Sequence, residues 1–400
     1  MKFLATCPKY IEGLLLQELQ SLGANDARET VGGVFFKGDL ALMYRVCLWS
    51  RLANRVLLPL VQDNIETAED LYRLASTIDW PDEFGVNSTF VVDFHGESYA
   101  IKNTQFGAQR IKDAIADTFR HQLGERPSVD KLYPDLRVYA YLHHSELTIG
   151  LDLSGRSLHE RGYRKQAGDA PLKENVAAAI LMRAKWPQAV KEGKRLIDPF
   201  CGSGTILIEA AWMAADIAPG LLNSQFGFLA WKAHDPVVWD AIWQEAKQRR
   251  QQGLAQTLPM LHGYDLDPRV LGVAKENMVL AGVDDLIQVT AKDVIQFIPP
   301  THKETAPGLI VTNPPYGHRL SDFTRLKDLH HAFGVRLKEH CVGWKLALLT
   351  AEVELAQQLQ IRAHKKHPIY NGALACQLLL FDIEQEAFRQ ERGERPEQDH

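Results

Sequence analysis

The chain has 400 residues, of which 46% are hydrophobic and 24% charged, and its formal net charge is −5. These values exclude a fibrous or fully disordered chain, and the length favours two or three globular domains over one. The charge excludes a chain that is basic throughout, although basic residues need only gather on one face to bind phosphate.

The cysteines and histidines give no sign of a metal centre. The five cysteines are scattered without a Cys-x-x-Cys pair, which argues against a zinc site or a disulfide framework. The pairs His143-His144 and His330-His331 lack the spacing of metal ligands. No signal-like run opens the chain, and no segment has 18 consecutive apolar residues. We therefore expect a cytoplasmic protein with no metal and no membrane association.

The first 155 residues alternate between strand-like and helix-like patterns, which predicts an α+β region. Strands are expected at Phe3–Thr6, Gly33–Gly38, Arg55–Val61, Thr89–Phe94, Arg137–His143 and Leu147–Asp152. Helices are expected at Tyr10–Leu22, from Asp39 as N-cap to Ala53, at Ala68–Ile78 and at Thr104–Leu123. A short polar turn separates the last two strands and predicts a hairpin.

A connector follows at Leu153–Lys173, and it is basic. Its cations are Arg156, Arg161, Arg164, Lys165 and Lys173. A solvated linker and a phosphate-contacting hinge both account for this composition.

From Glu174 onward strands and helices alternate as in a parallel sheet with crossover helices. Strands are expected at Arg195–Asp198, His262–Asp265, Leu286–Thr290, Leu309–Thr312, Lys345–Thr350 and Ala375–Asp382. A long insertion, residues 213–258, ends in a charged helix, and we interpret its residues Trp231, Trp239 and Trp243 as packing that helix. The tail from Ile383 carries six acids and three arginines and is expected to be disordered.

The first of these later strands leads into a glycine-rich turn. Its sequence is Asp198-Pro199-Phe200-Cys201-Gly202-Ser203-Gly204-Thr205. The glycines let the backbone approach a ligand closely, and the next helix offers its first amide groups. An acid after the following strand, Asp265, is well placed for a ribose diol. Asp267 is either a ligand or a helix cap, and Asp293 either accepts from an adenine amino group or caps a helix.

The fourth strand ends in Asn313-Pro314-Pro315-Tyr316. An exocyclic amine on a nucleobase is a poor nucleophile, because its lone pair is delocalised into the ring. The Asn313 side-chain oxygen and the Pro314 carbonyl can each accept one of its N–H groups, while Pro315 fixes the turn. Tyr316 offers a flat surface to an extruded base. The two motifs together predict methyl transfer from S-adenosyl-L-methionine to a nucleobase nitrogen, with Asn313 also lining the cofactor site.

These residues resemble the class I S-adenosylmethionine-dependent amino-methyltransferases. The stretches Leu158–Arg164, Ala170–Asn175 and Asn103–Ile115 look like those of methyltransferases that carry a THUMP RNA-binding domain. Nearly all of residues 1–382 resemble the bacterial 23S rRNA guanine-N2 methyltransferases of the G2445 type. The chain departs from many relatives in that no second methyltransferase follows.

The resemblance implies a Rossmann-like methyltransferase domain preceded by an α+β ferredoxin-like and THUMP region. The implied division is 1–60 ferredoxin-like, 61–155 THUMP, 156–173 linker, 174–382 methyltransferase and 383–400 tail. The implied partner is 23S rRNA or its ribosomal precursor particle, with N2-methylguanosine as product. A DNA adenine-N6 methyltransferase and a non-catalytic RNA-binding assembly factor are the alternatives.

Overall fold

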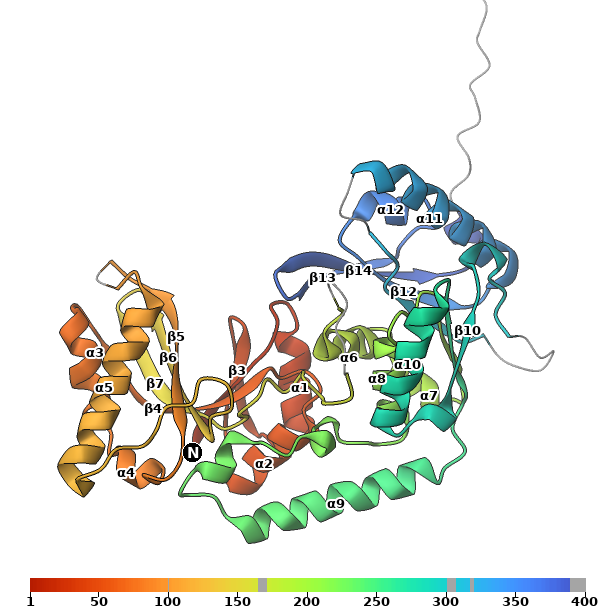
Figure 1. Ribbon diagram of the computed structural model, residues 1–400. Helices are drawn as coiled ribbons and strands as arrows, with labels where there is room; N and C mark the ends of the chain where they lie inside the picture. Colours follow the sequence, from red (N-terminus) through yellow and green to blue (C-terminus); the bar gives the residue numbers. More distant parts are fainter. Residues whose placement is uncertain (100, 165–170, 301–306, 317–319, 389–400) are drawn as a thin grey trace, which may run out of the picture. The chain divides into compact units, whose positions relative to one another are not determined.

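The computed structural model describes residues 1–99, 101–164, 171–300, 307–316 and 320–388. By its contacts the chain forms two compact units (Figure 1). The first contains Met1–Arg161 and Ala218–Gln248, and the second contains Gly162–Ile217 and Arg249–His400. The connector residues 165–170, with Lys165, and the tail residues 389–400 lie outside the described residues.

A seven-stranded sheet in the order β2-β3-β1-β4-β7-β6-β5 forms the centre of the first unit. Its strands are β1 (Lys2–Thr6), β2 (Asp26–Thr30), β3 (Gly33–Lys37), β4 (Arg55–Asn64), β5 (Phe90–Glu97), β6 (Leu136–His143) and β7 (Glu146–Asp152). Only β5 and β6 pair in parallel. The predicted boundary at residue 60 falls inside β4, which pairs with both β1 and β7, so one continuous sheet runs across that boundary.

Five helices accompany this sheet. They are α1 (Glu12–Ser21), α2 (Leu40–Trp49), α3 (Ala68–Ala75), α4 (Trp80–Glu83) and α5 (Thr104–Leu123). The predicted cap of α2 is confirmed, because the Asp39 carboxylate accepts from the Leu42 amide at 2.8 Å. α5 contacts α3, α4 and β5 (Figure 1). The predicted hairpin is also confirmed, and His144 turns it with φ of 55°.

Part of the long insertion belongs to the first unit. It contains the 3-10 turns η1 (Pro219–Leu222) and η2 (Gly227–Ala230), followed by the helix α9 (Pro236–Leu254). Tyr44 of α2 packs on Phe228, with ring centroids 4.8 Å apart, and on Trp239, at 5.6 Å. Trp239 in turn packs on Trp243 at 5.3 Å. The tryptophans therefore pack, as interpreted, but their partners include α2 as well as their own helix.

Two connector arginines are internal to the protein, so neither the solvated nor the phosphate-contacting interpretation holds for them. Arg161 is 2% exposed and donates to the backbone oxygens of Leu158 and Arg51, each at 2.7 Å. Arg164 donates to the Leu172 carbonyl at 2.9 Å and lies 3.4 Å from the Glu174 carboxylate. Both use their charge to fix the chain, because backbone carbonyls and an acid replace the solvent around them.

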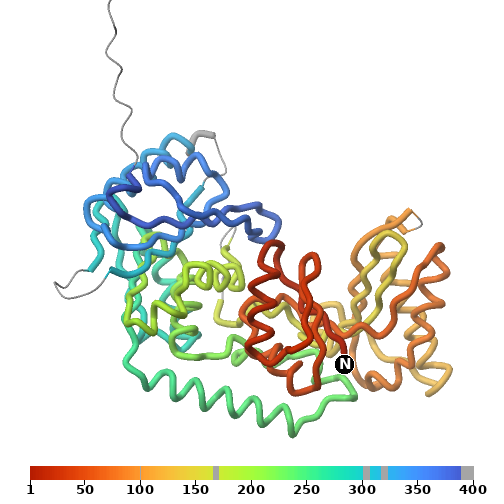
Figure 2. Tube along the Cα trace, turned by 180° about the vertical axis from the view of Figure 1, so that it is seen from behind, coloured from red at the N-terminus to blue at the C-terminus, as the bar shows by residue number. Residues whose placement is uncertain are grey.

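The second unit is built on a sheet in the order β10-β9-β8-β11-β12-β14-β13. Its strands are β8 (Leu196–Asp198), β9 (Leu261–Asp265), β10 (Ile287–Ala291), β11 (Leu309–Thr312), β12 (Lys345–Thr350), β13 (Lys365–Asn371) and β14 (Leu374–Asp382). The first five strands run parallel, and the β13–β14 hairpin, blue in Figures 1 and 2, adds an antiparallel pair. The expected crossover architecture is confirmed.

Helices cover both faces of this sheet. They are α6 (Glu174–Arg183), α7 (Trp186–Lys191), α8 (Thr205–Ala214), α10 (Pro268–Ala281), α11 (Leu320–His340) and α12 (Val353–Gln357). On β9, Gly263 meets the Leu207 side chain of α8, whereas Tyr264 joins the core that contains Phe333 of α11. Successive residues of a strand point to opposite faces, so α8 and α11 lie on opposite sides.

The expected disordered tail begins later than predicted. Ile383 is fully buried, and its amide donates to the Trp344 carbonyl at 2.9 Å. Phe388 forms a bridge with Ile361. An apolar residue every few positions lets this segment pack on the core despite its acids. Among the described residues, no helix is long and apolar enough to cross a membrane.

Candidate active site

The glycine-rich turn lies where the strand order of the second sheet reverses. The chain passes from β8 to β9 and β10 on one side, and then returns to β11 on the other side of β8. The carboxyl ends of β8 and β11 therefore diverge into a crevice, which is where open α/β sheets bind their ligands. Asp198 ends β8 and Asn313 follows β11, so the fold brings the two predicted motifs to the same crevice.

Positive φ angles shape the turn. Gly202 has φ of 52° and Gly204 has φ of 83°, a region that side chains other than glycine rarely adopt. A Cβ atom added at Gly202 would meet nothing within 4 Å, so this glycine faces open space. At Gly204 it would come within 3.0 Å of the Met278 side chain. Gly202 thus leaves room for a ligand, whereas Gly204 is required by close packing on α10.

Asp265 braces the same turn from the neighbouring strand. One of its carboxylate oxygens accepts from the Gly202 amide at 3.0 Å, and the other accepts from the Asp267 amide at 3.0 Å. Each carboxylate oxygen can accept a further bond. The predicted ribose ligand is therefore held rigidly against the glycine turn, with acceptor capacity to spare.

The remaining predicted residues of the turn have structural partners. Ser203 gives its carbonyl to the Asn277 side chain at 3.1 Å, and the Thr205 hydroxyl accepts from Arg164 at 2.8 Å. Pro199 is buried, and the Cys201 amide donates to the Tyr264 carbonyl at 2.8 Å. Burial raises the pKa of the Cys201 thiol well above its ordinary value, which leaves this thiol protonated and inert.

Asp198 lies beneath the turn and is fully buried. Its carboxylate accepts from the Thr312 hydroxyl at 2.6 Å and from the Phe200 amide at 3.1 Å. Burial is the largest influence and raises the pKa of Asp198 to about 7, against the two hydrogen bonds. Asp265 adds a smaller repulsion in the same direction. The contact with Thr312 ties the end of β8 to the end of β11.

Asp267 and Asp293 both act as caps. Asp267 accepts from the Arg269 amide at 2.9 Å at the start of α10, and its side chain also pairs with the Arg269 guanidinium. Asp293 accepts from the Ile295 amide at 3.0 Å, at the start of the 3-10 turn η4 (Val294–Gln296). The capping alternative therefore holds for both, and the adenine contact of Asp293 stays a prediction.

The Asn313–Tyr316 segment carries an unsatisfied acceptor. The Asn313 side-chain oxygen is buried, and it has no hydrogen-bond partner among the described residues. Pro314 is buried, Pro315 is exposed and Tyr316 is half-buried. Burial raises the pKa of the Tyr316 phenol, so it stays neutral. A buried acceptor left without a partner is costly, and it is expected where a ligand completes the site.

Sequence reasoning missed three supporting residues, namely Arg164, Asn277 and Thr312. Arg164 had been counted only as a basic connector residue, and Asn277 lies in a helix without any motif. Thr312 was assigned only to its strand. No local pattern marks such residues, because their role depends on contacts across the fold. For the described residues, no cluster of three or more potential metal ligands is found.

The fold and the crevice define a Rossmann-like methyltransferase with a ferredoxin-like and THUMP front half. The chain belongs to the family described as "RMKL-like, methyltransferase domain", whose model matches residues 161–379, more than half of the chain. Models of the RlmL ferredoxin-like domain and the THUMP domain match residues 2–57 and 66–152.

Individual relatives agree with this family. The chain is 49% identical over 394 residues to the ribosomal RNA large subunit methyltransferase K/L of Cellvibrio japonicus, an alignment that covers 98% of this chain and 52% of that protein. The chain thus spans about half the length of the curated relatives it matches.

Solved structures match over almost the whole chain. SMU.472, assigned as a methyltransferase and solved in complex with SAH, is 28% identical, with a TM-score of 0.83 and 98% of both chains covered. A Listeria monocytogenes protein described as a predicted N6-adenine-specific DNA methylase is 29% identical, with a TM-score of 0.81 and 95% of both chains covered.

Proposed function

We propose that this chain transfers a methyl group from S-adenosyl-L-methionine to the exocyclic N2 amine of a guanine in 23S rRNA, at a G2445-type site. The observation that carries the proposal is the buried, unpartnered side-chain oxygen of Asn313 at the crevice that also holds the glycine turn. An amine N–H is the kind of donor that satisfies this oxygen.

The residues around the turn fit the cofactor. The open space at Gly202 admits the methionine portion, and the start of α8 at Thr205 offers backbone amides to its carboxylate. Asp265 accepts from the ribose hydroxyls, and Asp293 accepts from the adenine amino group with the oxygen that its cap leaves unused. The cofactor supplies a sulfonium-bound methyl group and departs as a neutral thioether.

The acceptor residues activate and aim the amine. Asn313 and the Pro314 carbonyl each take one N–H, which localises the nitrogen lone pair and directs it along a line set by the turn. Pro315 holds this turn rigid, and the ring of Tyr316 stacks on the extruded base. The amine nitrogen gains the methyl group and releases one proton. Orientation and hydrogen bonding carry the rate enhancement.

The assignment of RNA as substrate rests on the front half of the chain and on the name of the relatives. A THUMP-type domain suits an RNA partner, and the relatives are named as ribosomal RNA methyltransferases. Because the match covers about half of those relatives, the activity, the rRNA or precursor-particle partner and a cytoplasmic location are part of the proposal. The same holds for the division at residues 60, 155, 173 and 382.

A DNA adenine-N6 methyltransferase is the second candidate. The specific observation in its favour is the Listeria monocytogenes structure, which is described as such an enzyme. Adenine N6 and guanine N2 are both exocyclic amines, so the Asn313 acceptor suits either. A non-catalytic RNA-binding assembly factor is less consistent with a buried acceptor kept without a partner.

The proposal is tested by transfer of a labelled methyl group to unmodified 23S rRNA and, in parallel, to duplex DNA. We expect incorporation into the rRNA only. Incorporation into the DNA alone would move the second candidate ahead, and cofactor binding without transfer to either would support the assembly factor.

A further inference from the structure

The first unit contains a cavity of about 720 Å³ that the proposed chemistry does not use. Four separate segments line it: Asn87-Ser88, the loop Leu132–Arg137 before β6, the connector residues Gly155–Glu160, and Ser224–Ala230 of the insertion. All of them belong to this unit. The volume falls in the range of ligand pockets and suits one or two nucleotides.

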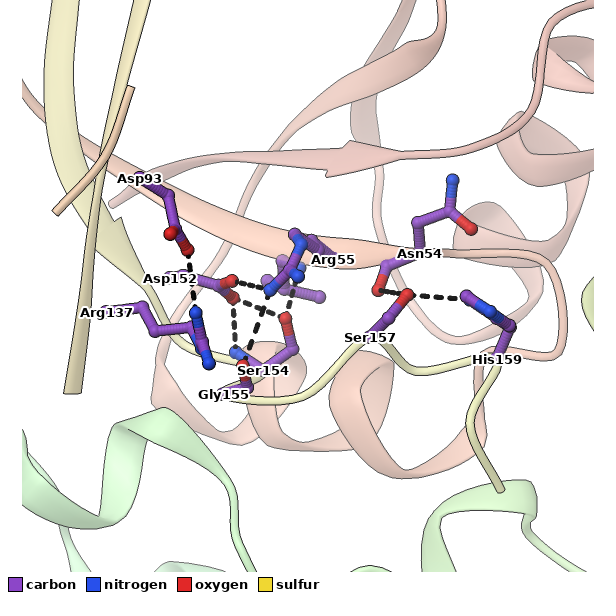
Figure 3. A network of polar contacts seen from close by, with 10 residues as sticks. Asn54, Arg55, Asp93, Arg137, Asp152, Ser154, Gly155, Ser157 and His159 are labelled. Carbon is purple, nitrogen blue, oxygen red and sulfur yellow. Dashed lines mark hydrogen bonds and ion pairs between the residues drawn. The ribbon is translucent and has the colours of Figure 1, made fainter. Parts of the chain in front are cut away.

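Two arginines in the lining are held in place from behind by acids. Arg55 donates from one terminal nitrogen to the buried Asp152 carboxylate, and Arg137 donates in the same way to Asp93 at 2.9 Å (Figure 3). Asp152 also accepts from the Ser154 amide, so its position is fixed. Among the described residues, the other terminal nitrogens of these two arginines have no recorded bond. Such an oriented guanidinium presents its remaining N–H groups to a ligand.

The charge that faces the cavity is positive. Arg156 lines it, is exposed, and has no recorded ion pair in the described part of the chain. Asp135 also lines it, but its carboxylate accepts from both the amide and the hydroxyl of Thr89, at 2.7 and 2.8 Å. Glu160 is the remaining acid in the lining, against three arginines.

An exposed aromatic side chain stands among these charges. Tyr133 is 70% exposed and Leu132 is 77% exposed, and both line the cavity. The Asp130 carboxylate accepts from the Leu132 amide at 2.8 Å and the Tyr133 amide at 3.0 Å, which fixes the loop that presents them. A fixed, solvent-facing tyrosine beside arginines is the combination that single-stranded nucleic acids bind, by stacking of a base and pairing of phosphates.

We propose that this cavity binds a single-stranded segment of RNA, with a base stacked on Tyr133 and phosphates held by Arg55, Arg137 and Arg156. The proposal rests on the proposed function for the choice of RNA. It adds a contact in the first unit that involves the connector and the insertion, and not the residues 66–152 matched as THUMP alone.

The test measures binding of a short fluorescein-labelled single-stranded oligoribonucleotide to the full chain. Tyr133→Ala should weaken binding about 5- to 100-fold, the range expected for loss of one stacked base. Arg156→Ala should reduce the slope of log affinity against log salt by about 0.7, the value for one phosphate contact on a single strand. Arg55 and Arg137 are left intact, because their removal would strand acids.

Matched controls come from the same unit. Tyr99→Ala removes a tyrosine that is 97% exposed, and Arg126→Ala removes an exposed arginine, and neither residue lines the cavity. Both should bind like the wild type. Wild-type affinity in Tyr133→Ala and Arg156→Ala, or equal losses in the controls, would overturn the proposal.

The outcome is separable from that of the proposed function. If the wild type transfers methyl groups to rRNA while the cavity variants bind RNA normally, the cavity proposal alone fails. If the variants lose RNA binding as expected while the wild type transfers no methyl group, the proposed chemistry alone fails.

Discussion

At the scale of single residues, Asn313 and Asp265 have different relations to their surroundings. Asp265 already makes two hydrogen bonds to backbone amides, whereas the side-chain oxygen of Asn313 makes none among the described residues. The first residue therefore has a structural role that any substitution disturbs. The second has an acceptor whose expected partner is the substrate.

Replacing Asn313 by alanine should lower the rate of methyl transfer by ~10²–10³, the usual cost of one transition-state hydrogen bond. Cofactor affinity should be nearly unchanged, which calorimetry can establish. Asn313→Asp keeps an acceptor oxygen and should retain more of the rate. A fully active Asn313→Ala protein would remove the acceptor role.

Replacing Asp265 by alanine should weaken cofactor binding by about tenfold or more, since a hydrogen bond to a charged acceptor contributes roughly 1.5–3 kcal/mol. The variant also loses the brace on Gly202, so its melting temperature should fall. Asp265→Asn keeps one acceptor and should lie between the two. Unchanged cofactor affinity in a folded Asp265→Ala protein, measured by calorimetry, would count against the assignment.

Asp198 predicts a pH dependence of stability. Burial raises its pKa from 3.8 to about 7, so between these values the folded protein holds a proton that the unfolded chain has released. The free energy of unfolding should therefore fall as pH rises through this window, by up to about 4 kcal/mol. Asp198→Asn should lack this component in urea unfolding between about pH 4 and pH 7. Parallel curves for the two proteins would contradict the prediction.

At the scale of elements, the sequence predicts the buried strands well and the edge strands poorly. β8, β9, β11 and β12 are apolar runs, so their positions follow from composition. β2 (Asp26–Thr30) and β13 (Lys365–Asn371) were not predicted. Both lie at sheet edges, and they carry the charges and the proline that edges tolerate, which hides the strand pattern.

The attachment of the insertion to α2 predicts a stability effect. The Tyr44 hydroxyl bonds His234 Nδ1 and accepts from the Asp235 amide, both at 2.8 Å. Tyr44→Phe should lower the free energy of unfolding by about 1–3 kcal/mol, because these partners lose their bonds. Tyr141→Phe, at a site 51% exposed, should be neutral. Equal urea midpoints for all three proteins would show that this contact does not stabilise the insertion.

At the scale of the whole molecule, local patterns do not reveal which distant segments fold together. Residues 218–248 lie between β8 and β9 in the sequence, yet they pack in the first unit through Tyr44 and its neighbours. The sheet continuous through β4 was equally invisible. Both depend on side-chain contacts over more than a hundred residues, whereas the two motifs of the candidate site are each local and could be predicted.

The central claim is that the acceptor is the N2 amine of a guanine in RNA. The most direct measurement is mass spectrometry of nucleosides from unmodified 23S rRNA after incubation with the protein and S-adenosylmethionine. The account predicts N2-methylguanosine with the wild type and a strongly reduced yield with Asn313→Ala. Finding N6-methyladenosine, or no methylated nucleoside from a protein that binds the cofactor, would contradict it.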